Sequence, residues 1–453
     1  MDPKNNTYRL FILLALVYWN PASFYLLYQD TELYDFKLLH VLFWFVCVAG
    51  LIIVFMLRRN RIGNRWKNLF FSFSTAGILF SLIVLVNAAC GWIWPARTGW
   101  LFEPGSRVRY ETCEFNYLAS INSLGLRNAE IDIDKKENFR ILCVGDSWTF
   151  GWGVNIENSW PASLERYLKE NGISHVQVIN AGKPGMYSRS YKTALKKMIP
   201  ALKPDLVILG MLQLDDLAQS YEEAHRPVKK DKHSAIEKIW YAAKILFQHS
   251  TDHIRRLVKK DDQEISIKPE WSASAGAMIE NFSASELARF NLLSDSMKTM
   301  FRNAAISPSV LYYYIHFPNR VNTFNNPVGK EVQFAMAEMT KDIASVSSFC
   351  ASHGAKLLFL NLPTHSFAGH KQPALPGDEL DGWYASNNQV DPLYRWVADV
   401  NQVPYLELTK LMNDNGDYFF RYDGHPNERG YEKIASLAGQ YLLASDLIPK
   451  RKQ

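Results

Sequence analysis

The feature that most constrains the fold of this chain is a series of short apolar runs that end in glycine or polar residues. These runs lie at 141–144, 176–179, 206–209, 356–362 and 405–408. Patterns typical of helices lie between and after them: residues 159–171 begin with a serine and an early proline, residues 332–353 are periodically apolar, and a third pattern follows Asn427. Strands that alternate with helices predict an α/β protein with a parallel sheet.

A serine follows the first of these strands at a tight turn. In the sequence ILCVGDSWTFGWGV, Gly145 and Asp146 break the apolar run directly before Ser147. A strand that enters a sharp turn lifts a hydroxyl clear of the sheet edge, which is how nucleophilic serines are presented. Gly-Asp-Ser is also a common turn tripeptide, so a solvated β-turn is the alternative interpretation.

A nucleophilic serine needs an imidazole base and a group that orients this base. The C-terminal segment DGHPNERGY offers Asp423 and His425, directly before a helix with Asn427 as its expected N-cap. Two polar strand ends lie between the motifs, in VINAGKPGMYS at 178–188 and PDLVILGMLQLDD at 204–216. Because the ends of parallel strands meet along one edge of a sheet, where ligands bind, we expect these segments to converge.

Across residues 115–445 these motifs resemble the SGNH (GDSL) hydrolase family, in particular bacterial membrane-anchored members. The segments NSLGLRN, at 122–128, and FGWGV, after the serine, are similar to the family as well. The resemblance implies a flavodoxin-like, three-layer parallel sheet. It also implies that Ser147 is the nucleophile, His425 the general base and then acid, and Asp423 the group that holds the imidazole. No cofactor is implied, and the chain has no CxxC, HExxH or phosphate-loop pattern.

The same resemblance implies an oxyanion hole. Gly185 of NAGKPG matches the family's glycine, whose backbone amide would bind the oxyanion together with that of Ser147. The family's third donor is the asparagine of an Asn-Asp pair, but this chain has Asp215 and then Asp216 at that place. An ionised carboxylate would repel the developing oxyanion, so Asp215 must be protonated, turned away or replaced in function by Gln213.

Long apolar stretches near the start of the chain predict a membrane anchor. Residues 38–57 and 69–94 are each long enough for the roughly 20 residues that span a bilayer. Residues 10–28 are a third candidate, for which a signal peptide is the alternative. The loop at 58–67 is strongly basic, so the positive-inside rule places everything after about residue 95 outside the cytoplasm. We expect a multi-pass protein of the cytoplasmic (inner) membrane whose catalytic domain faces the periplasm or the cell exterior.

The expected organisation has three parts. Residues 1–95 form the membrane anchor, residues 96–140 a juxtamembrane linker with a small β element, and residues 141–446 the hydrolase domain. A helical insertion at about 220–330 interrupts that domain. Its clearest helix, at 234–260, has a basic face, which is either the solvated side of a cap helix or a surface for the membrane or an acidic glycan.

Charge and cysteine content add little. The net charge is +5 and the basic loop at 58–67 accounts for it, so no nucleic-acid partner is expected. Cys113 and Cys350 show no spacing typical of a disulfide framework, and their pairing is left open.

The function expected from the resemblance is a membrane-anchored, extracytoplasmic serine esterase. Its substrates would be O-acyl esters, chiefly O-acetyl esters, of envelope carbohydrate or lipid. One alternative is an acyltransferase that uses the same serine to O-acylate a cell-surface polysaccharide, with a membrane partner protein as acyl donor. The other alternative is an inactive glycan-binding or assembly subunit, which the carboxylate of Asp215 favours.

Overall fold

The computed structural model describes residues 99–226, 264–267, 275–303, 315–316, 320–364, 388–412, 417–420 and 422–449, together with Arg65. Apart from Arg65, these residues belong to one compact unit that comprises residues 97–227 and 262–453. The three expected membrane spans and the expected helix at 234–260 lie outside the described residues. Within the described part of the chain, no helix is both long and apolar enough to cross a bilayer.

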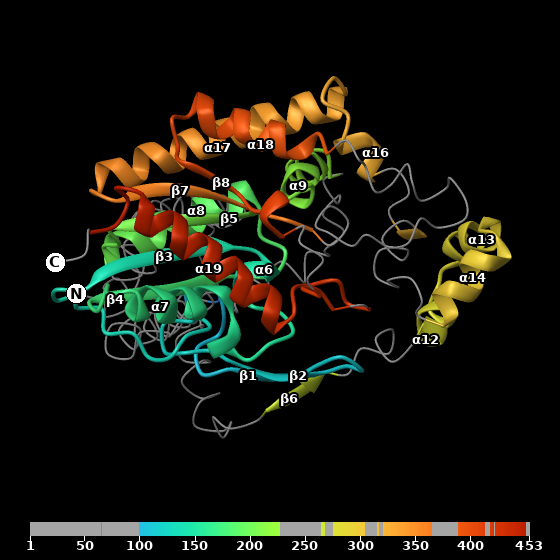
Figure 1. Ribbon diagram of the computed structural model, residues 1–453, viewed down its shortest axis with the longest axis horizontal. Helices are drawn as coiled ribbons and strands as arrows, with labels where there is room; N and C mark the ends of the chain where they lie inside the picture. Colours follow the sequence, from blue (N-terminus) through green and yellow to red (C-terminus); the bar gives the residue numbers. More distant parts are fainter. Residues whose placement is uncertain are drawn as a thin grey trace. The chain divides into compact units, whose positions relative to one another are not determined.

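A parallel sheet of five described strands forms the centre of this unit (Figure 1). The strands are β3 (Phe139–Gly145), β4 (Val176–Gly182), β5 (Leu206–Leu212), β7 (Lys356–Leu362) and β8 (Tyr405–Glu407). They lie in the order β4-β3-β5-β7-β8, and every neighbouring pair is parallel. Numbered along the chain this order is 2-1-3-4-5, the order of flavodoxin-like sheets. The point where the winding direction reverses therefore lies between β3 and β5, where open α/β sheets bind ligands.

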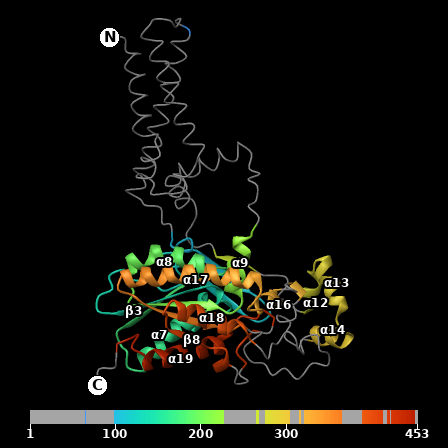
Figure 2. The same ribbon diagram turned by 90° about the horizontal axis from the view of Figure 1, so that it is seen from above.

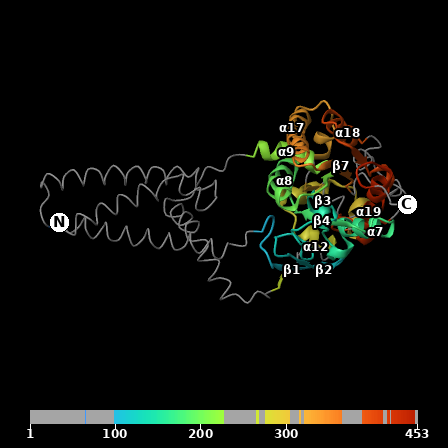
Figure 3. The same ribbon diagram turned by 90° about the vertical axis from the view of Figure 1, so that its left-hand side faces the viewer.

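Helices cover both faces of the sheet, because side chains along a strand alternate between the two faces. Leu142 and Val144 of β3 face a core that includes α8 (Ser188–Leu202), α9 (Asp215–Ala224), α17 (Lys330–Ser352) and α18 (Val390–Val400). Ile141 and Cys143 face a second core with α7 (Trp160–Glu170) and α19 (Glu428–Ala444). Figures 1, 2 and 3 show these layers from three directions, with α17 and α18 on one side of the sheet and α7 and α19 on the other.

The five expected strands and the expected helices at 159–171, at 332–353 and after Asn427 are present, with small shifts at their ends. The Asn427 side chain caps α19 by accepting a hydrogen bond from the Gly430 backbone N–H at 3.0 Å. Ser159 occupies the N-cap position of α7, but its hydroxyl donates to the Ile156 carbonyl at 2.7 Å instead of capping the helix. The short helices η1 (Ile156–Asn158) and η3 (Lys410–Met412) and the single-turn helix α6 (Ser147–Phe150) complete the elements around the sheet.

A smaller sheet lies outside the parallel sheet. Strands β1 (Arg107–Glu111) and β2 (Asn116–Ser120) are antiparallel, and β6 (Ile265–Ile267) pairs in parallel with β1. The region expected to be a helical insertion contributes β6 and the helices α12 (Ala275–Glu280), α13 (Ala284–Leu292), α14 (Asp295–Arg302) and α16 (Arg320–Phe324). Cys113, Cys143 and Cys350 are free thiols.

Candidate active site

The turn after β3 presents Ser147 as the first residue of α6. Asp146 is the N-cap, and its carboxylate accepts a hydrogen bond from the Trp148 backbone N–H at 2.9 Å. Two glycines allow α6 to lie directly against the strand ends. A Cβ atom on Gly182 would lie 2.1 Å from the Phe150 backbone nitrogen, and one on Gly145 would lie 2.7 Å from a backbone carbonyl of β5. Larger residues at these two positions would displace the turn that carries the serine.

A buried arginine fixes the loop that follows the serine. Arg127 is 1% exposed, and its guanidinium donates to the carbonyls of Phe150, Gly151 and Val154 at 3.0, 2.6 and 2.6 Å. The guanidinium carbon of Arg127 also lies over the Tyr117 ring, 4.9 Å from the ring centroid. The NSLGLRN segment therefore stabilises the loop after the nucleophile through Arg127.

Ser147, His425 and Asp423 come together although 278 residues separate the serine from the histidine. The distance from Ser147 Oγ to His425 Nε2 is 2.9 Å, and that from His425 Nδ1 to Asp423 Oδ1 is 2.5 Å. A carboxylate can only accept, so Nδ1 carries the proton and Nε2 is free to accept from the serine hydroxyl. This is the arrangement that makes a serine nucleophilic at neutral pH.

Neighbouring groups hold this histidine and aspartate in place. Trp152 Nε1 donates to Asp423 Oδ2 at 3.2 Å, and the Trp148 ring centroid lies 4.2 Å from that of His425. Glu114, in the turn between β1 and β2, accepts the backbone N–H of Asp423 at 2.9 Å. Gly424, with φ of 84°, allows the sharp turn between the aspartate and the histidine. The Asp423 side chain is 4% exposed, so water is largely excluded from it.

Gly185 lies in a tight turn after β4. The Met186 N–H donates to the Lys183 carbonyl at 3.2 Å, and Pro184 and Gly185 are the two central residues of this turn. The φ of 78° at Gly185 is typical of the third position of a type II turn, which favours glycine. The Lys183 N–H donates to the Gly145 carbonyl at 3.0 Å, so the turn lies beside the segment that carries Ser147. This placement is compatible with an oxyanion donor at Gly185.

Asp215 is paired with an arginine that the sequence did not single out. Its Oδ1 lies 2.7 Å from Nη1 of Arg320, which begins α16 in the insertion. The guanidinium also bonds to Glu222, with Nε 3.0 Å from the carboxylate. Gln213 cannot replace the missing asparagine, because its amide nitrogen donates to Asp391 at 2.6 Å and to Thr409 at 3.2 Å. Of the three expected outcomes, a carboxylate turned toward a partner therefore fits the structure, and replacement by Gln213 is wrong.

The backbone before Asp215 is strained. Leu214 has φ of 67° and ψ of −50°, and the Asp215 N–H donates to the Gln213 carbonyl at 2.8 Å. These angles and this hydrogen bond define a γ-turn of the rare form, which a residue with a Cβ adopts only at an energetic cost. Such strain is concentrated at functional sites, and this one lies at the carboxyl end of β5.

Two further carboxyl groups are buried behind the serine. Burial raises the pKa of Asp146 to about 7, and the charge of Asp215 adds to this rise, while the Trp148 N–H and the charge of His425 oppose it. Burial raises the pKa of Asp216 well above its usual range, and the charge of Asp146 raises it further. The Tyr191 hydroxyl donates to Asp216 at 3.0 Å. Burial therefore favours the protonated form of both Asp146 and Asp216.

The chain is similar to several solved structures. No protein-family model and no curated protein matches the chain. Among solved structures, a lipolytic protein of the G-D-S-L family from Desulfitobacterium hafniense DCB-2 is 13% identical and covers 67% of this chain and 99% of its own, with a TM-score of 0.31. The lipase/acylhydrolase from Enterococcus faecalis is also 13% identical, covers 67% and 94%, and has a TM-score of 0.31. A variant of an acetyl-xylooligosaccharide esterase from Geobacillus stearmophilus is 11% identical, covers 69% and 97%, and has a TM-score of 0.33.

The sheet order 2-1-3-4-5 is that of flavodoxin-like sheets, and the Ser147–His425–Asp423 arrangement has the geometry of a catalytic triad; both resemble the SGNH hydrolases. The matched structures are G-D-S-L lipolytic proteins and acyl-ester hydrolases, and the chain resembles them. At these identities and TM-scores the matches do not decide the reaction, which must be inferred from the geometry of the site.

Proposed function

We propose that the protein hydrolyses O-acyl esters with Ser147 as nucleophile. The observation that carries this proposal is the unbroken hydrogen-bond chain from Asp423 through His425 to the serine hydroxyl. A structural serine in a solvated turn needs no such partners. The inactive-subunit alternative also gives no reason for the buried aspartate to hold the imidazole in the one tautomer that activates Ser147.

The reaction follows from these positions. Ser147 Oγ attacks the ester carbonyl carbon, its proton passes to His425 Nε2, and the carbonyl oxygen becomes an oxyanion. The backbone amides of Ser147 and Gly185 bind this oxyanion. When the carbon–oxygen bond of the ester breaks, the alcohol leaves with the proton from His425, and the acyl group stays on the serine. Water then gives a proton to His425 and attacks the acyl group, which releases the acid and restores the serine.

The ion pair between Asp215 and Arg320 bears on the rate. Where the family has an amide donor, this chain has a carboxylate whose charge a guanidinium balances. The pair removes most of the repulsion that an isolated carboxylate would exert on the oxyanion, but it supplies no amide donor. Two backbone donors with no third donor are expected to give a slow esterase on simple esters, because one oxyanion donor is worth about 10²–10³ in rate.

The proposed substrates are O-acyl, chiefly O-acetyl, esters of envelope carbohydrate or lipid. The sequence supports an extracytoplasmic, membrane-anchored protein through its apolar stretches and its basic loop at 58–67. An acyltransferase is the second candidate, because a polysaccharide hydroxyl could attack the acyl-serine in place of water. The two reactions share the acyl-serine and the oxyanion hole and differ only in the nucleophile of the second step.

Labelling with a small fluorophosphonate tests the proposal. We expect the parent protein to be labelled at Ser147 and the Ser147→Ala variant to lose both labelling and ester hydrolysis. Ser436→Ala is a matched control, because that hydroxyl only donates to the Lys433 carbonyl on α19. If Ser147→Ala hydrolyses 4-nitrophenyl acetate at the parent rate, the proposed site is wrong. Transfer of acetyl to an oligosaccharide faster than to water would favour the acyltransferase.

A further inference from the structure

A pocket beside the Gly185 turn contains none of the three triad residues and has a marked charge. It has a volume of about 450 Å³ and lies between the start of α8, the turn after β4 and the segment before β1. We call it the basic pocket; the residues used below are Trp100, Lys183, Tyr187, Arg189, Thr193 and Lys197. Its volume falls within the range of about 300–1,000 Å³ that small-molecule and cofactor sites usually have.

The charged residues that line the basic pocket are all cations. It contains Lys183, Arg189 and Lys197, and no carboxylate is among its lining residues. Arg189 bonds to Glu338 at 2.8 Å, outside the lining, whereas neither lysine has an acidic partner among the described residues. The charge of Arg189 is offset by Glu338 and Asp342, but those of Lys183 and Lys197 are not, so an anion bound near the two lysines would be stabilised.

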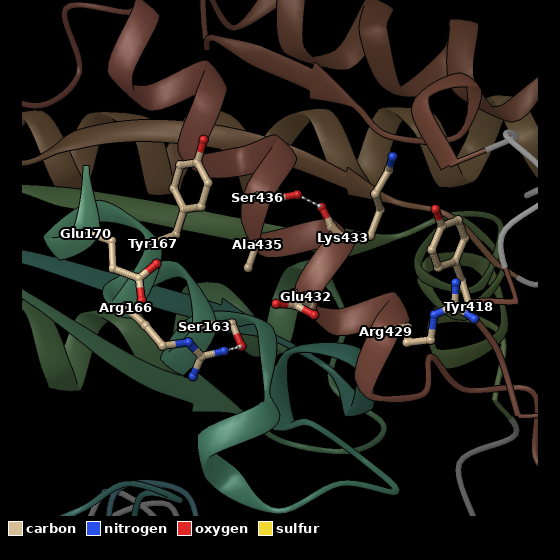
Figure 4. Close-up of a pocket in the computed structure, with 10 residues that line it drawn as sticks. All are labelled: Ser163, Arg166, Tyr167, Glu170, Tyr418, Arg429, Glu432, Lys433, Ala435 and Ser436. Carbon is tan, nitrogen blue, oxygen red and sulfur yellow. Dashed lines mark hydrogen bonds between the residues drawn. The ribbon is translucent and has the colours of Figure 1, made fainter.

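The pocket between α7 and α19 gives a direct contrast. It has a similar volume, about 410 Å³, but Glu170 and Glu432 stand among its arginines and lysine (Figure 4). Two carboxylates therefore offset most of the three positive charges in this pocket, and Arg166 is already bonded to Ser163 at 3.0 Å. The two pockets therefore differ in charge: carboxylates line the pocket between α7 and α19, and none is among the lining residues of the basic pocket.

The basic pocket also offers groups that bind sugar rings. The half-buried indole of Trp100 and the phenol ring of Tyr187 provide flat amphipathic surfaces, and Thr193 provides a hydroxyl. The ammonium of Lys183 lies 5.6 Å from the Phe102 ring centroid, which holds it at the pocket edge. An aromatic surface next to cations suits a sugar that carries a carboxylate, since the ring can stack while the acid accepts charge-assisted hydrogen bonds.

The basic pocket and the catalytic serine share one loop. Lys183 lines the pocket through its side chain, and its backbone N–H donates to the Gly145 carbonyl two residues before Ser147. Gly185, the proposed oxyanion donor, lines the pocket as well. We propose that the basic pocket binds a uronic-acid residue of an acylated polysaccharide, and so positions a neighbouring acylated sugar at Ser147. The positioning at Ser147 rests on the proposed function, whereas the binding of the uronic acid is independent of it.

Calorimetric titration of the full-length protein in neutral detergent tests the inference. The probes are trimers of galacturonic, glucuronic and mannuronic acid, titrated separately, with maltotriose as a neutral trimer. We expect at least one uronate trimer to bind, with affinity falling about tenfold in Lys197→Ala, the usual value of one charge-assisted hydrogen bond. Lys196→Ala is the matched control. It removes the same charge from the preceding residue of α8, which is exposed and does not line the pocket.

The outcomes separate the inference from the proposed function. Ser147→Ala should bind the uronate trimer as the parent does, so a failure of catalysis leaves this binding result standing. The inference is overturned if no uronate trimer binds, if maltotriose binds as tightly, or if Lys196→Ala and Lys197→Ala weaken binding equally. Vesicles with and without phosphatidylglycerol form the last arm. Binding to the anionic vesicles that depends on Lys197, without binding to any trimer, would assign the pocket to a lipid headgroup.

Discussion

The two oxygens of Asp423 receive different donors, and this asymmetry predicts what an asparagine would do there. Oδ1 accepts from the Nδ1–H and the backbone N–H of His425, at 2.5 and 3.2 Å. Oδ2 accepts from Trp152 Nε1 at 3.2 Å. Asparagine has one acceptor and one donor group in place of two acceptors, so it cannot satisfy all three N–H groups.

Either orientation of the asparagine damages the site. If its oxygen faces His425, its NH₂ group confronts the Trp152 N–H, and two donors face each other. If its NH₂ group faces His425, Nδ1 must accept, Nε2 carries the proton, and the imidazole can no longer accept from Ser147. An unsatisfied buried donor costs about 1–3 kcal/mol, which corresponds to about 5- to 150-fold. The loss of the charge that stabilises the imidazolium adds to this cost.

We therefore expect Asp423→Asn to lower kcat for 4-nitrophenyl acetate by about 10³–10⁴. Adding Trp152→Phe removes the competing donor and lets the asparagine oxygen face His425, so the double variant should recover about tenfold. Trp152→Phe alone should cost only a few-fold, since the ring can keep its packing on Tyr110, whose centroid lies 4.7 Å away. Initial rates of all four proteins, with circular dichroism to confirm folding, make the measurement. A double variant no faster than Asp423→Asn would refute the tautomer argument.

Three further predictions follow from the groups around the serine. Asp215→Asn should raise kcat on simple acetyl esters at neutral pH by up to about 10²–10³, because its amide can supply the third oxyanion donor; a slower variant would mean that Asp215 binds substrate or acceptor. Arg127→Met should lower the free energy of unfolding by about 2–4 kcal/mol, measured by thermal unfolding, since three buried carbonyls lose their donor; an unchanged Tm would contradict this. The folded-state pKa of Asp146 is raised, so its contribution to stability is present below pH 4 and is lost as the pH rises to about 7. Asp146→Asn should therefore flatten the fall in Tm between pH 4 and 7, and parallel curves for parent and variant would count against the raised pKa.

The sequence predicts the layers of this fold well, because hydrophobic periodicity is a local signal. The apolar run at 206–209 is buried on both faces in β5, and the strand continues to Leu212. The candidate triad could also be predicted, since Ser147 follows the Gly145–Asp146 turn at a strand end, and Asp423 and His425 lie directly before the helix capped by Asn427. The parallel order of the strands brings these two segments to one edge of the sheet.

The supporting contacts could not be predicted, because no local pattern encodes a pairing between distant side chains. Arg320 begins α16, and nothing in its sequence neighbours points to Asp215. Glu114 sits in an ordinary hairpin turn, yet it holds the backbone of Asp423 across 309 residues. Trp152 lies in the FGWGV segment after the serine, but the sequence does not show that its indole N–H donates to Asp423.

The bond between Glu114 and the Asp423 loop also affects the order in which activity is gained and lost. The site joins the first hairpin of the unit to its last turn, so the triad is assembled only when nearly the whole unit has folded. In the opposite direction, local opening of the final segment would separate His425 from Ser147 while the central strands stayed paired. Esterase activity should therefore disappear at lower denaturant concentration than the secondary structure, so that it reports the integrity of the chain's end and not that of its core.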